Sequence, residues 1–268
     1  MKKVILLSLL VLSSCVYDDH VSYRQDSEFL FPTGALQHHS QYSQVSFRHL
    51  ADSVKKNAVP AGHNLYREGM LTITGKKERK KYNFEFKYND LEDWSLLLTN
   101  IESASREISL HKNHLGLTFQ QVPRDLFLQG EDDKIWQHMS QNYWHRKLKR
   151  IIEALLSPHI DPSYNWSEEA DGLKYYVITR IEEQGLQHIK HQVYLHKKGG
   201  VLTRYMKNGL EEENLEDLKY SHYKEYGPSF LPTRVYIKYP KHGMRVDLDI
   251  TGTQVNKSTR KPKAFKKI

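Results

Sequence analysis

Apolar side chains recur at every second position through much of this chain, which is the pattern of strands that bury one face. Between residues 82 and 88, for example, four aromatic residues alternate with polar ones, and the charged stretch 75–81 before them is typical of a hairpin turn. Eleven strands are predicted in this way, at residues 71–74, 82–88, 94–99, 106–111, 115–120, 175–181, 191–196, 201–207, 218–226, 234–239 and 245–251.

Two segments show helical spacing instead. Apolar residues between positions 42 and 59 predict one amphipathic helix, and a longer pattern from Asp133 to Ser157 predicts another, which Pro158 ends. The second segment contains Trp136 and several basic residues. It is either a helix that lies on a membrane surface or, as we favour, a helix that packs into the core with one solvated face.

Together these elements predict an α+β fold with a single curved antiparallel sheet of about eleven strands and helices covering its concave face. The chain shows neither repeated βαβ units nor a solenoid repeat. Each strand would turn one apolar face to the concave side, and a helical lid could cover that face without filling the space below it. Such a cavity binds acyl chains through the apolar area that is buried, at about 25 cal/mol per Å².

The first fifteen residues are organised like an export signal. Lys2 and Lys3 precede an apolar run, residues 4–12, that is too short to span a bilayer but suits the core of a signal peptide. The sequence Leu12-Ser-Ser-Cys15 follows, and it resembles the lipobox of bacterial lipoproteins. An ordinary secretory signal with an incidental cysteine is the alternative. Because the chain has no other cysteine, we expect Cys15 to be the lipid anchor.

Residues that could carry catalysis or bind metals do not form a recognisable pattern. The single cysteine leaves no disulfide framework within the chain and no Cys-based zinc site. Histidine pairs with i, i+3 spacing fall in predicted strands or turns, where the two rings do not share one face. HExxH, GxSxG, P-loop and GxGxxG motifs are all missing from the sequence. We therefore expect no enzymatic activity, no metal site and no cofactor.

The formal net charge of +8 is concentrated at the two ends of the chain. Two lysines of the signal and six basic residues near the C-terminus account for all of it, so the body between them is neutral. The six C-terminal residues are Lys257, Arg260, Lys261, Lys263, Lys266 and Lys267. Such a run is usually a solvated, disordered end, and the alternative is contact with anionic lipid head groups. Export argues against a nucleic-acid partner.

The predicted organisation has four parts. Residues 1–14 are the signal peptide, and residues 15–40, which show no periodicity, are a lipidated tether. Residues 41–255 form one domain, within which 131–172 is a helical insertion or lid. Residues 256–268 are the basic tail.

Seven short sequences along the predicted strands match one known family. The most specific are Trp94-Ser-Leu-Leu-Leu-Thr-Asn100 and Glu107-Ile-Ser-Leu110. The others, in the same order along the chain, are Leu65-Tyr-Arg-Glu-Gly69, Tyr82-Asn-Phe-Glu-Phe-Lys-Tyr88, Tyr205-Met-Lys-Asn-Gly209, Leu231-Pro232 and Arg245-Val-Asp-Leu248. Over residues 42–120 and 200–255 the chain resembles LolB, the outer-membrane lipoprotein that receives other lipoproteins from a periplasmic carrier.

The resemblance implies an eleven-stranded half-barrel with a helical lid, an acyl-binding cavity and an outer-membrane location on the periplasmic face. Val16, which stands where an aspartate commonly retains lipoproteins in the inner membrane, also favours the outer membrane. Two features depart from the family. An exposed leucine that helps pass cargo to the membrane is replaced by Ile101-Glu102, which makes Ile101 the candidate membrane-facing residue. Segment 131–172 is also longer and more basic than its counterpart.

We therefore expect a lipid-binding outer-membrane lipoprotein that is not an enzyme. Its expected partners are the acyl chains of lipoproteins or other lipids and a LolA-like periplasmic carrier. The candidate acyl-binding or core residues are Leu96, Leu98, Ile108, Leu110 and Trp136. The alternative is an envelope lipoprotein that uses the same fold to bind a protein partner in stress sensing or envelope assembly.

Overall fold

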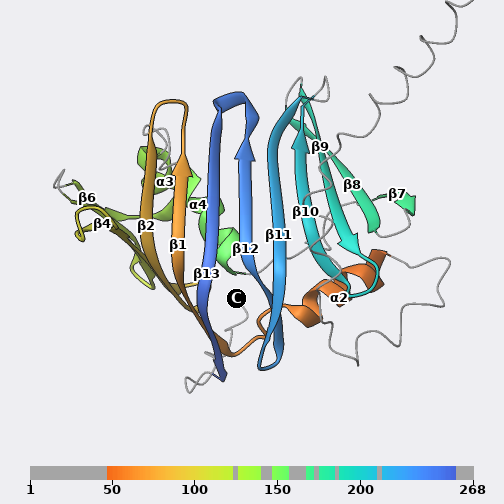
Figure 1. Cartoon of the computed structure of the whole chain (residues 1–268), viewed down its shortest axis with the longest axis horizontal. Coiled ribbons are helices and arrows are strands. Elements are labelled where there is room, and N and C mark those ends of the chain that lie inside the picture. Colours follow the sequence, from red (N-terminus) through yellow and green to blue (C-terminus); the bar gives the residue numbers. More distant parts are fainter. Residues whose placement is uncertain are drawn as a thin grey trace, which may run out of the picture.

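The computed structural model describes residues 47–122, 126–139, 147–156, 167–171, 175–184, 187–209 and 213–257. Most of them form strands: β1 His63–Thr74, β2 Arg79–Asp90, β3 Asp93–Asn100, β4 Arg106–Asn113, β5 Gly116–Gln121, β6 Leu126–Gly130, β7 Ser167–Asp171, β8 Tyr175–Gln184, β9 Gln187–His196, β10 Val201–Asn208, β11 Asn214–Tyr226, β12 Ser229–Tyr239 and β13 Met244–Lys257. These strands make one antiparallel sheet in the order β6-β5-β4-β3-β2-β1-β13-β12-β11-β10-β9-β8-β7 (Figure 1). Since β6 and β7 are the two edges, the sheet is not closed into a barrel.

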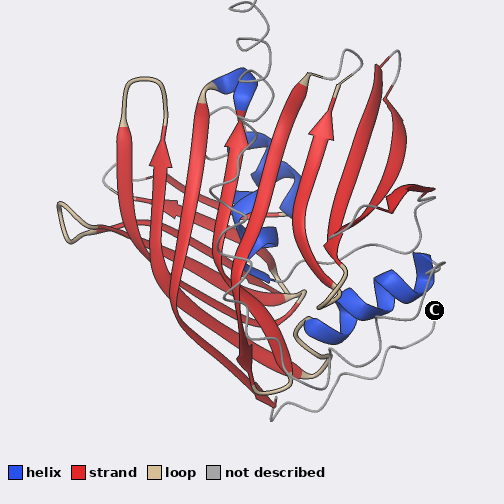
Figure 2. Ribbon diagram, turned by 45° about the vertical axis from the view of Figure 1, so that its right-hand side comes forward, coloured by secondary structure: helices blue, strands red, loops and turns tan. Residues whose placement is uncertain are grey.

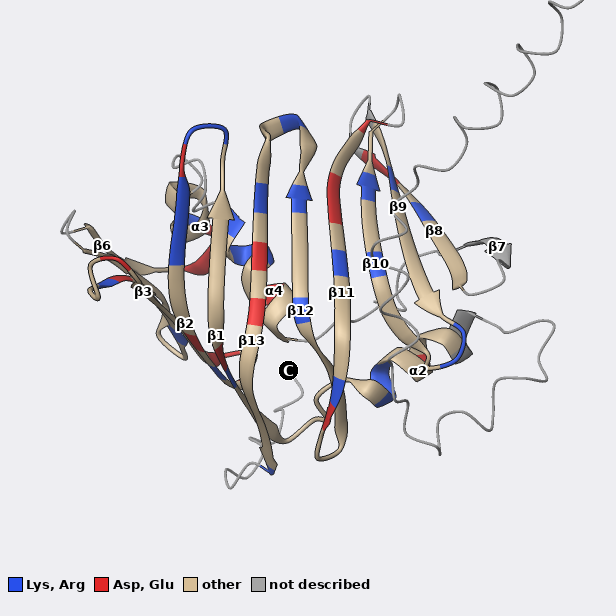
Figure 3. Cartoon of the chain, in the orientation of Figure 1, with Lys and Arg blue, Asp and Glu red and all other residues tan. Residues whose placement is uncertain are grey.

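The strand registers place one apolar surface along the sheet. Leu71 of β1 lies opposite Tyr82 of β2 and Leu248 of β13, and Phe86 of β2 lies opposite Leu96 of β3. Directly opposed residues point to the same side of a sheet, so these residues share a surface that we call the inner face. Strands near the two edges run in clearly different directions (Figure 2), which shows that the sheet is curved. Charged residues gather instead at the turn between β1 and β2 (Figure 3).

The described helices are α2 (Phe47–Asn57), α3 (Asp132–Met139) and α4 (Leu148–Leu156), with one turn of 3₁₀ helix at Pro240–His242. Buried residues of all three α-helices belong to the same hydrophobic cluster as the inner face. Near the C-terminal end of α2, the Asn57 side chain donates to the carbonyl oxygen of Gly199 over 3.0 Å, which ties this helix to the turn before β10. None of the helices in the described residues is long and apolar enough to cross a membrane.

The antiparallel meander confirms the predicted sheet, but the strand number rises from about eleven to thirteen. Neither β6 nor β7 is predicted by the sequence pattern. β6 has five residues and closely follows Pro123, while β7 has the sequence SEEAD, in which no apolar alternation exists. The helix predicted over 133–157 corresponds to α3 and α4, and residues 140–146 between them lie outside the described residues. The predicted signal peptide and tether also lie outside them.

Candidate functional site on the inner face

Large apolar side chains form the inner face of β2–β5. Leu96 and Leu98 of β3 lie opposite Leu110 and Ile108 of β4, and all four are buried. The four predicted strand positions therefore lie side by side on one surface. The same surface is extended on the neighbouring strands by Phe84, Phe86 and Phe119, which are also buried.

Helix α3 is attached to this half of the sheet by an ion pair. Lys112, which faces inward opposite Leu117, places its Nζ 2.6 Å from the carboxylate of Asp132 at the start of the helix. A carboxylate in the first turn is also favoured by the helix dipole. Trp136, one turn further on, is partly buried and packs against the hydrophobic cluster. Trp136 thus contacts the core from the helix, whereas the four leucine and isoleucine positions belong to the sheet.

Helix α4 and Lys147, the residue just before it, contact the strands β10 and β12 through basic side chains. The Lys147 ammonium lies 3.9 Å from the centre of the Tyr239 ring, and the Arg150 guanidinium lies 4.6 Å from the centre of the Tyr205 ring. Arg150 also donates from Nε to Glu216 over 2.5 Å and from Nη1 to Glu153 over 2.9 Å. Burial alone would lower the pKa of Arg150, but the neighbouring carboxylates outweigh this effect and raise it. Arg150 is therefore a well-paired cation.

The polar contacts continue from Tyr205 of β10 across two more strands, β9 and β8. Its hydroxyl lies 2.7 Å from Nδ1 of His191, whose Nε2 lies 2.9 Å from Glu182. Arg180 donates to the same carboxylate over 2.7 Å. Burial, together with the charge of Arg180, lowers the pKa of His191 to about 4, so this imidazole is neutral at pH 7. We call this set of residues the Arg150 cluster: Arg150, Glu153, Arg180, Glu182, His191, Tyr205 and Glu216.

A second arginine faces inward from the middle of β1 and lacks a carboxylate partner among the described residues. The side chain of Arg67 is 0% exposed. Its Nη2 donates to the carbonyl oxygen of Pro232 over 3.3 Å, whereas Nε and Nη1 are buried without an acceptor. Burial lowers the pKa of Arg67 to about 10, which still leaves it charged at pH 7. The groups that oppose this shift are the hydroxyls of Tyr226, Tyr223 and Tyr220.

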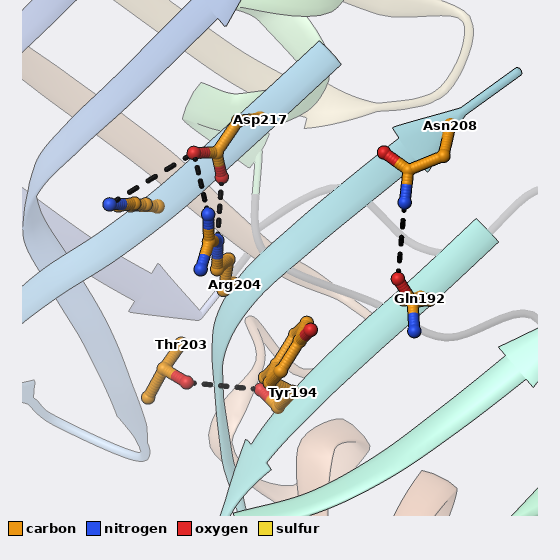
Figure 4. Close-up of polar contacts among 7 residues, drawn as sticks. Gln192, Tyr194, Thr203, Arg204, Asn208 and Asp217 are labelled. Atoms are coloured by element: carbon orange, nitrogen blue, oxygen red, sulfur yellow. Dashed lines mark hydrogen bonds and ion pairs between the residues drawn. The ribbon is translucent and has the colours of Figure 1, made fainter. Parts of the chain in front are cut away.

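On the outer face of β9–β11, in contrast to Arg67, a partly buried arginine has a carboxylate partner. Arg204 donates from Nε and Nη2 to the two carboxylate oxygens of Asp217, over 2.8 and 3.0 Å (Figure 4). Nearby, the Asn208 amide donates to the side-chain oxygen of Gln192 over 3.1 Å. A bidentate arginine–carboxylate pair is among the stronger polar contacts in proteins. Arg67 has nothing comparable within the described chain.

The other predicted site residues lie at the periphery or beyond the described residues. Ile101 is 39% exposed in the connection between β3 and β4, next to Glu102, whose backbone N–H bonds to the Asn100 side chain over 2.8 Å. Lys257 is the exposed last residue of β13. Cys15 and the remaining basic residues of the tail lie outside the described residues. In the described part of the chain, no group of His, Cys, Asp and Glu side chains is arranged to hold a metal ion.

Sequence reasoning identified neither Arg67 nor the Arg150 cluster. A signal for Arg67 exists, because it stands in phase with Leu65, Leu71 and Ile73, at a position where the alternation predicts an inward apolar residue. No comparable signal exists for the Arg150 cluster. Its members come from α4 and four strands, and only the register of the sheet brings them together.

Known structures share this fold. A LolA-superfamily protein from Nitrosomonas europaea superposes with a TM-score of 0.53 and 11% identity, over 82% of this chain and 96% of that one. A putative outer-membrane lipoprotein-sorting protein domain from Vibrio parahaemolyticus gives a TM-score of 0.55 and 11% identity, over 77% and 90%. A DUF1329 family protein from Desulfovibrio piger gives 0.54 and 13%, over 77% and 92%.

The sequence itself matches no protein-family model and no curated protein. At 11–13% identity the three structural matches establish the fold and not the activity. They agree with the resemblance that the strand sequences show, because all three cover most of both chains. The chain therefore shares the fold of these structures, a curved and open antiparallel sheet, and one of them is a LolA-superfamily protein.

Proposed function

We propose that this protein binds the acyl chains of lipids or lipoproteins on the inner face of its sheet, beneath α3 and α4. The observation that carries the proposal is the continuous apolar surface of β1–β5, β12 and β13, which the two short helices α3 and α4 pack against. Acyl chains need no directed polar contact, and their burial is favourable by about 25 cal/mol per Å² of apolar area. A surface of this kind suits them better than a substrate that must be oriented for a reaction.

The helices define how such a ligand would enter. Apolar residues of α3 and α4 pack in the same cluster as the inner face, so an acyl chain takes the place of some of these side chains. The polar contacts that attach the helices, Lys112 with Asp132 and Arg150 with Glu216, are made by side chains and are not part of the backbone ladder of the sheet. We infer that α3 and α4 are the moving parts and that the sheet is the rigid part.

More specifically, we propose that the protein accepts lipoproteins from a periplasmic carrier for insertion in the outer membrane. Lipid on Cys15 would anchor the protein to that membrane, and Ile101 would be its membrane-facing residue. The sequence resemblance to LolB supports this activity, as does the likeness to a domain described as lipoprotein-sorting. No covalent step is required, because cargo chains would move from a weaker apolar site to a stronger one and then into the bilayer.

A transfer assay tests the proposal. The mature Cys15→Ala protein is mixed with carrier that is loaded with a labelled triacylated lipoprotein, and the label should move to it. We expect Leu110→Gln, which places an amide on the inner face, to reduce transfer at least tenfold. The matched control is Ser109→Gln, because the neighbouring residue of the same strand points to the outer face. Circular dichroism confirms that both variants are folded.

One observation favours a second candidate function. The inner face and helices already pack as one cluster, as expected if the surface is filled and the protein instead binds another protein in envelope assembly or stress sensing. If label stays on the carrier and fluorescent fatty acids do not bind the folded protein, acyl-chain binding is wrong and this candidate replaces it. Equal loss of transfer in Leu110→Gln and Ser109→Gln would exclude the inner face as the binding surface.

A further inference from the structure

The residue that lies opposite Arg67 on the neighbouring strand β13 is also polar. Thr253 of β13 lies directly opposite Arg67 in the ladder, so both side chains point to the inner face. The Oγ1 atom of Thr253 is buried and has no hydrogen-bond partner among the described residues, which is also true of Nε and Nη1 of Arg67. Two directly opposed residues of the inner face therefore both carry buried polar atoms that have no hydrogen-bond partner among the described residues.

The sheet is irregular at this point. The ladder between β1 and β13 shifts register between Glu68 and Gly69, where β13 contributes the extra residue Thr251. Beyond this bulge the inward positions of β13 change from even to odd residue numbers, and this change turns Thr253 inward. A Cβ atom on Gly69 would lie 2.1 Å from the carbonyl oxygen of Asp249, so the bulge requires glycine. Bulges often re-aim a side chain next to a functional site.

The pairing of Arg67 is incomplete in a way that suits an anion. A guanidinium has five N–H donors whose planar geometry matches carboxylate and phosphate groups, and Arg67 uses Nη2 alone, toward the Pro232 carbonyl. Burying a charge without a counter-charge is costly, and an apolar residue in phase with Leu65 and Leu71 would avoid this cost. Residues that break a local rule without compensation within the fold are expected at functional sites.

A row of apolar residues leads away from Arg67 across the sheet. Phe86 lies directly opposite Arg67, and each further member lies opposite the one before it on the next strand: Phe86, Leu96, Leu110, Phe119 and Leu128. With strands about 4.8 Å apart, the row is roughly 19 Å long. One acyl chain spans about 15 Å, half of the hydrocarbon thickness of a bilayer. The row can therefore accommodate one long acyl chain with its polar end at Arg67.

We propose that Arg67 and Thr253 bind the anionic group, a carboxylate or a phosphate, of a ligand whose acyl chain lies along this row. The inference rests on the proposed acyl-chain binding and adds a ligand class to it, namely an acidic amphiphile. The Arg67 side chain and the Oγ1 atom of Thr253 are buried, so the anion enters with its chain and is neutralised away from solvent, where a charge-assisted hydrogen bond is strong.

Binding of matched probes to the mature Cys15→Ala protein tests this site. Palmitate and hexadecanol have the same chain length and differ in charge, and inorganic phosphate supplies an anion without a chain. We expect palmitate to bind at least tenfold more tightly than hexadecanol. Arg67→Met should abolish the preference for palmitate, while the affinity for hexadecanol changes less than threefold. Arg67→Lys should retain part of this preference, and Thr253→Val should reduce the preference several-fold. Arg234→Met, which removes an exposed arginine of β12, is the matched control and should leave every affinity unchanged.

The phosphate arm identifies the source of the anion. If phosphate at millimolar concentration displaces palmitate and raises the unfolding temperature of the wild type but not of Arg67→Met, the site accepts a free anion. If phosphate has neither effect while palmitate keeps its preference, the anion is the head group of an amphiphile. Both results support an anion site at Arg67 and Thr253.

Two other results separate this inference from the proposed function. If hexadecanol binds as tightly as palmitate, and Arg67→Met changes neither, acyl-chain binding stands and the anion site is wrong. If neither chain binds the folded protein, acyl-chain binding is wrong, and the Arg67-dependent effect of phosphate on unfolding then decides the anion site alone. If phosphate still raises the unfolding temperature of Arg67→Met, the anion site at Arg67 and Thr253 is also wrong.

Discussion

Arg150 and Arg67 both lie close enough to Tyr220 to influence its hydroxyl, but they differ in how their own charge is compensated. Arg150, on α4, binds two carboxylates and lies over an aromatic ring, so its pKa is raised. Arg67, on β1, is more deeply buried, has one carbonyl partner among the described residues, and its pKa is lowered. The same residue type thus serves two purposes. Arg150 attaches a helix to the sheet, whereas two nitrogens of Arg67 have no acceptor among the described residues.

Removing the carboxylate partner of Arg150 should have the largest effect on stability. Glu216→Leu leaves a partly buried cation with one carboxylate, and we expect the free energy of unfolding to fall by about 3 kcal/mol. The double variant Arg150→Met/Glu216→Leu should recover at least half of this loss, because no unpaired charge remains. Urea unfolding measures both. Asp247→Leu, which removes the partner of the exposed Arg245, should cost roughly 0.5 kcal/mol or less.

The histidine of the Arg150 cluster should make stability depend on pH. The pKa of His191 is about 4 in the folded protein and about 6.5 in the unfolded chain, so the unfolded state binds the proton first as pH falls. The free energy of unfolding should therefore decrease between pH 6.5 and pH 4, by up to about 2 kcal/mol. His191→Gln should flatten this dependence. His188→Gln, an exposed position on the same strand, should retain it, and an unchanged slope in His191→Gln would contradict the assignment.

Replacing Arg67 should have the smallest effect on stability. Arg67→Met removes one hydrogen bond, worth about 1 kcal/mol, but it also removes an unpaired buried charge. We expect the free energy of unfolding to change by less than about 1 kcal/mol in either direction in urea unfolding. A loss as large as that of Glu216→Leu would show that Arg67 supports the fold. The contrast between the two arginines would then disappear.

The sequence predicted most of the sheet because its strands alternate strongly. The aromatic residues of β2 alternate with polar residues and so indicate their buried face directly, and the structure places them on the inner face. In β3, with three consecutive leucines, the structure places Leu96 and Leu98 on this face and Leu97 on the other. Alternation could not predict β7, whose five residues are polar or small. Such an edge strand forms because β8 offers it a partner, and this information is not local to its sequence.

The site was less predictable than the fold. Leu96, Leu98, Ile108 and Leu110 could be placed on one surface because sequence spacing determines the face of a strand. Arg67 lies outside the predicted strand 71–74, and only its register with Thr253 and its missing acceptors distinguish it. The Arg150 cluster depends on contacts between residues up to 66 positions apart, which periodicity does not encode.

The strand order has a mechanical consequence. β6 and β7 follow one another in the chain but form opposite edges of the sheet, so the segment with α3 and α4 runs from one edge to the other. Because this segment is covalently joined to both edge strands, we expect a ligand that displaces α3 and α4 to affect the two edges of the sheet together.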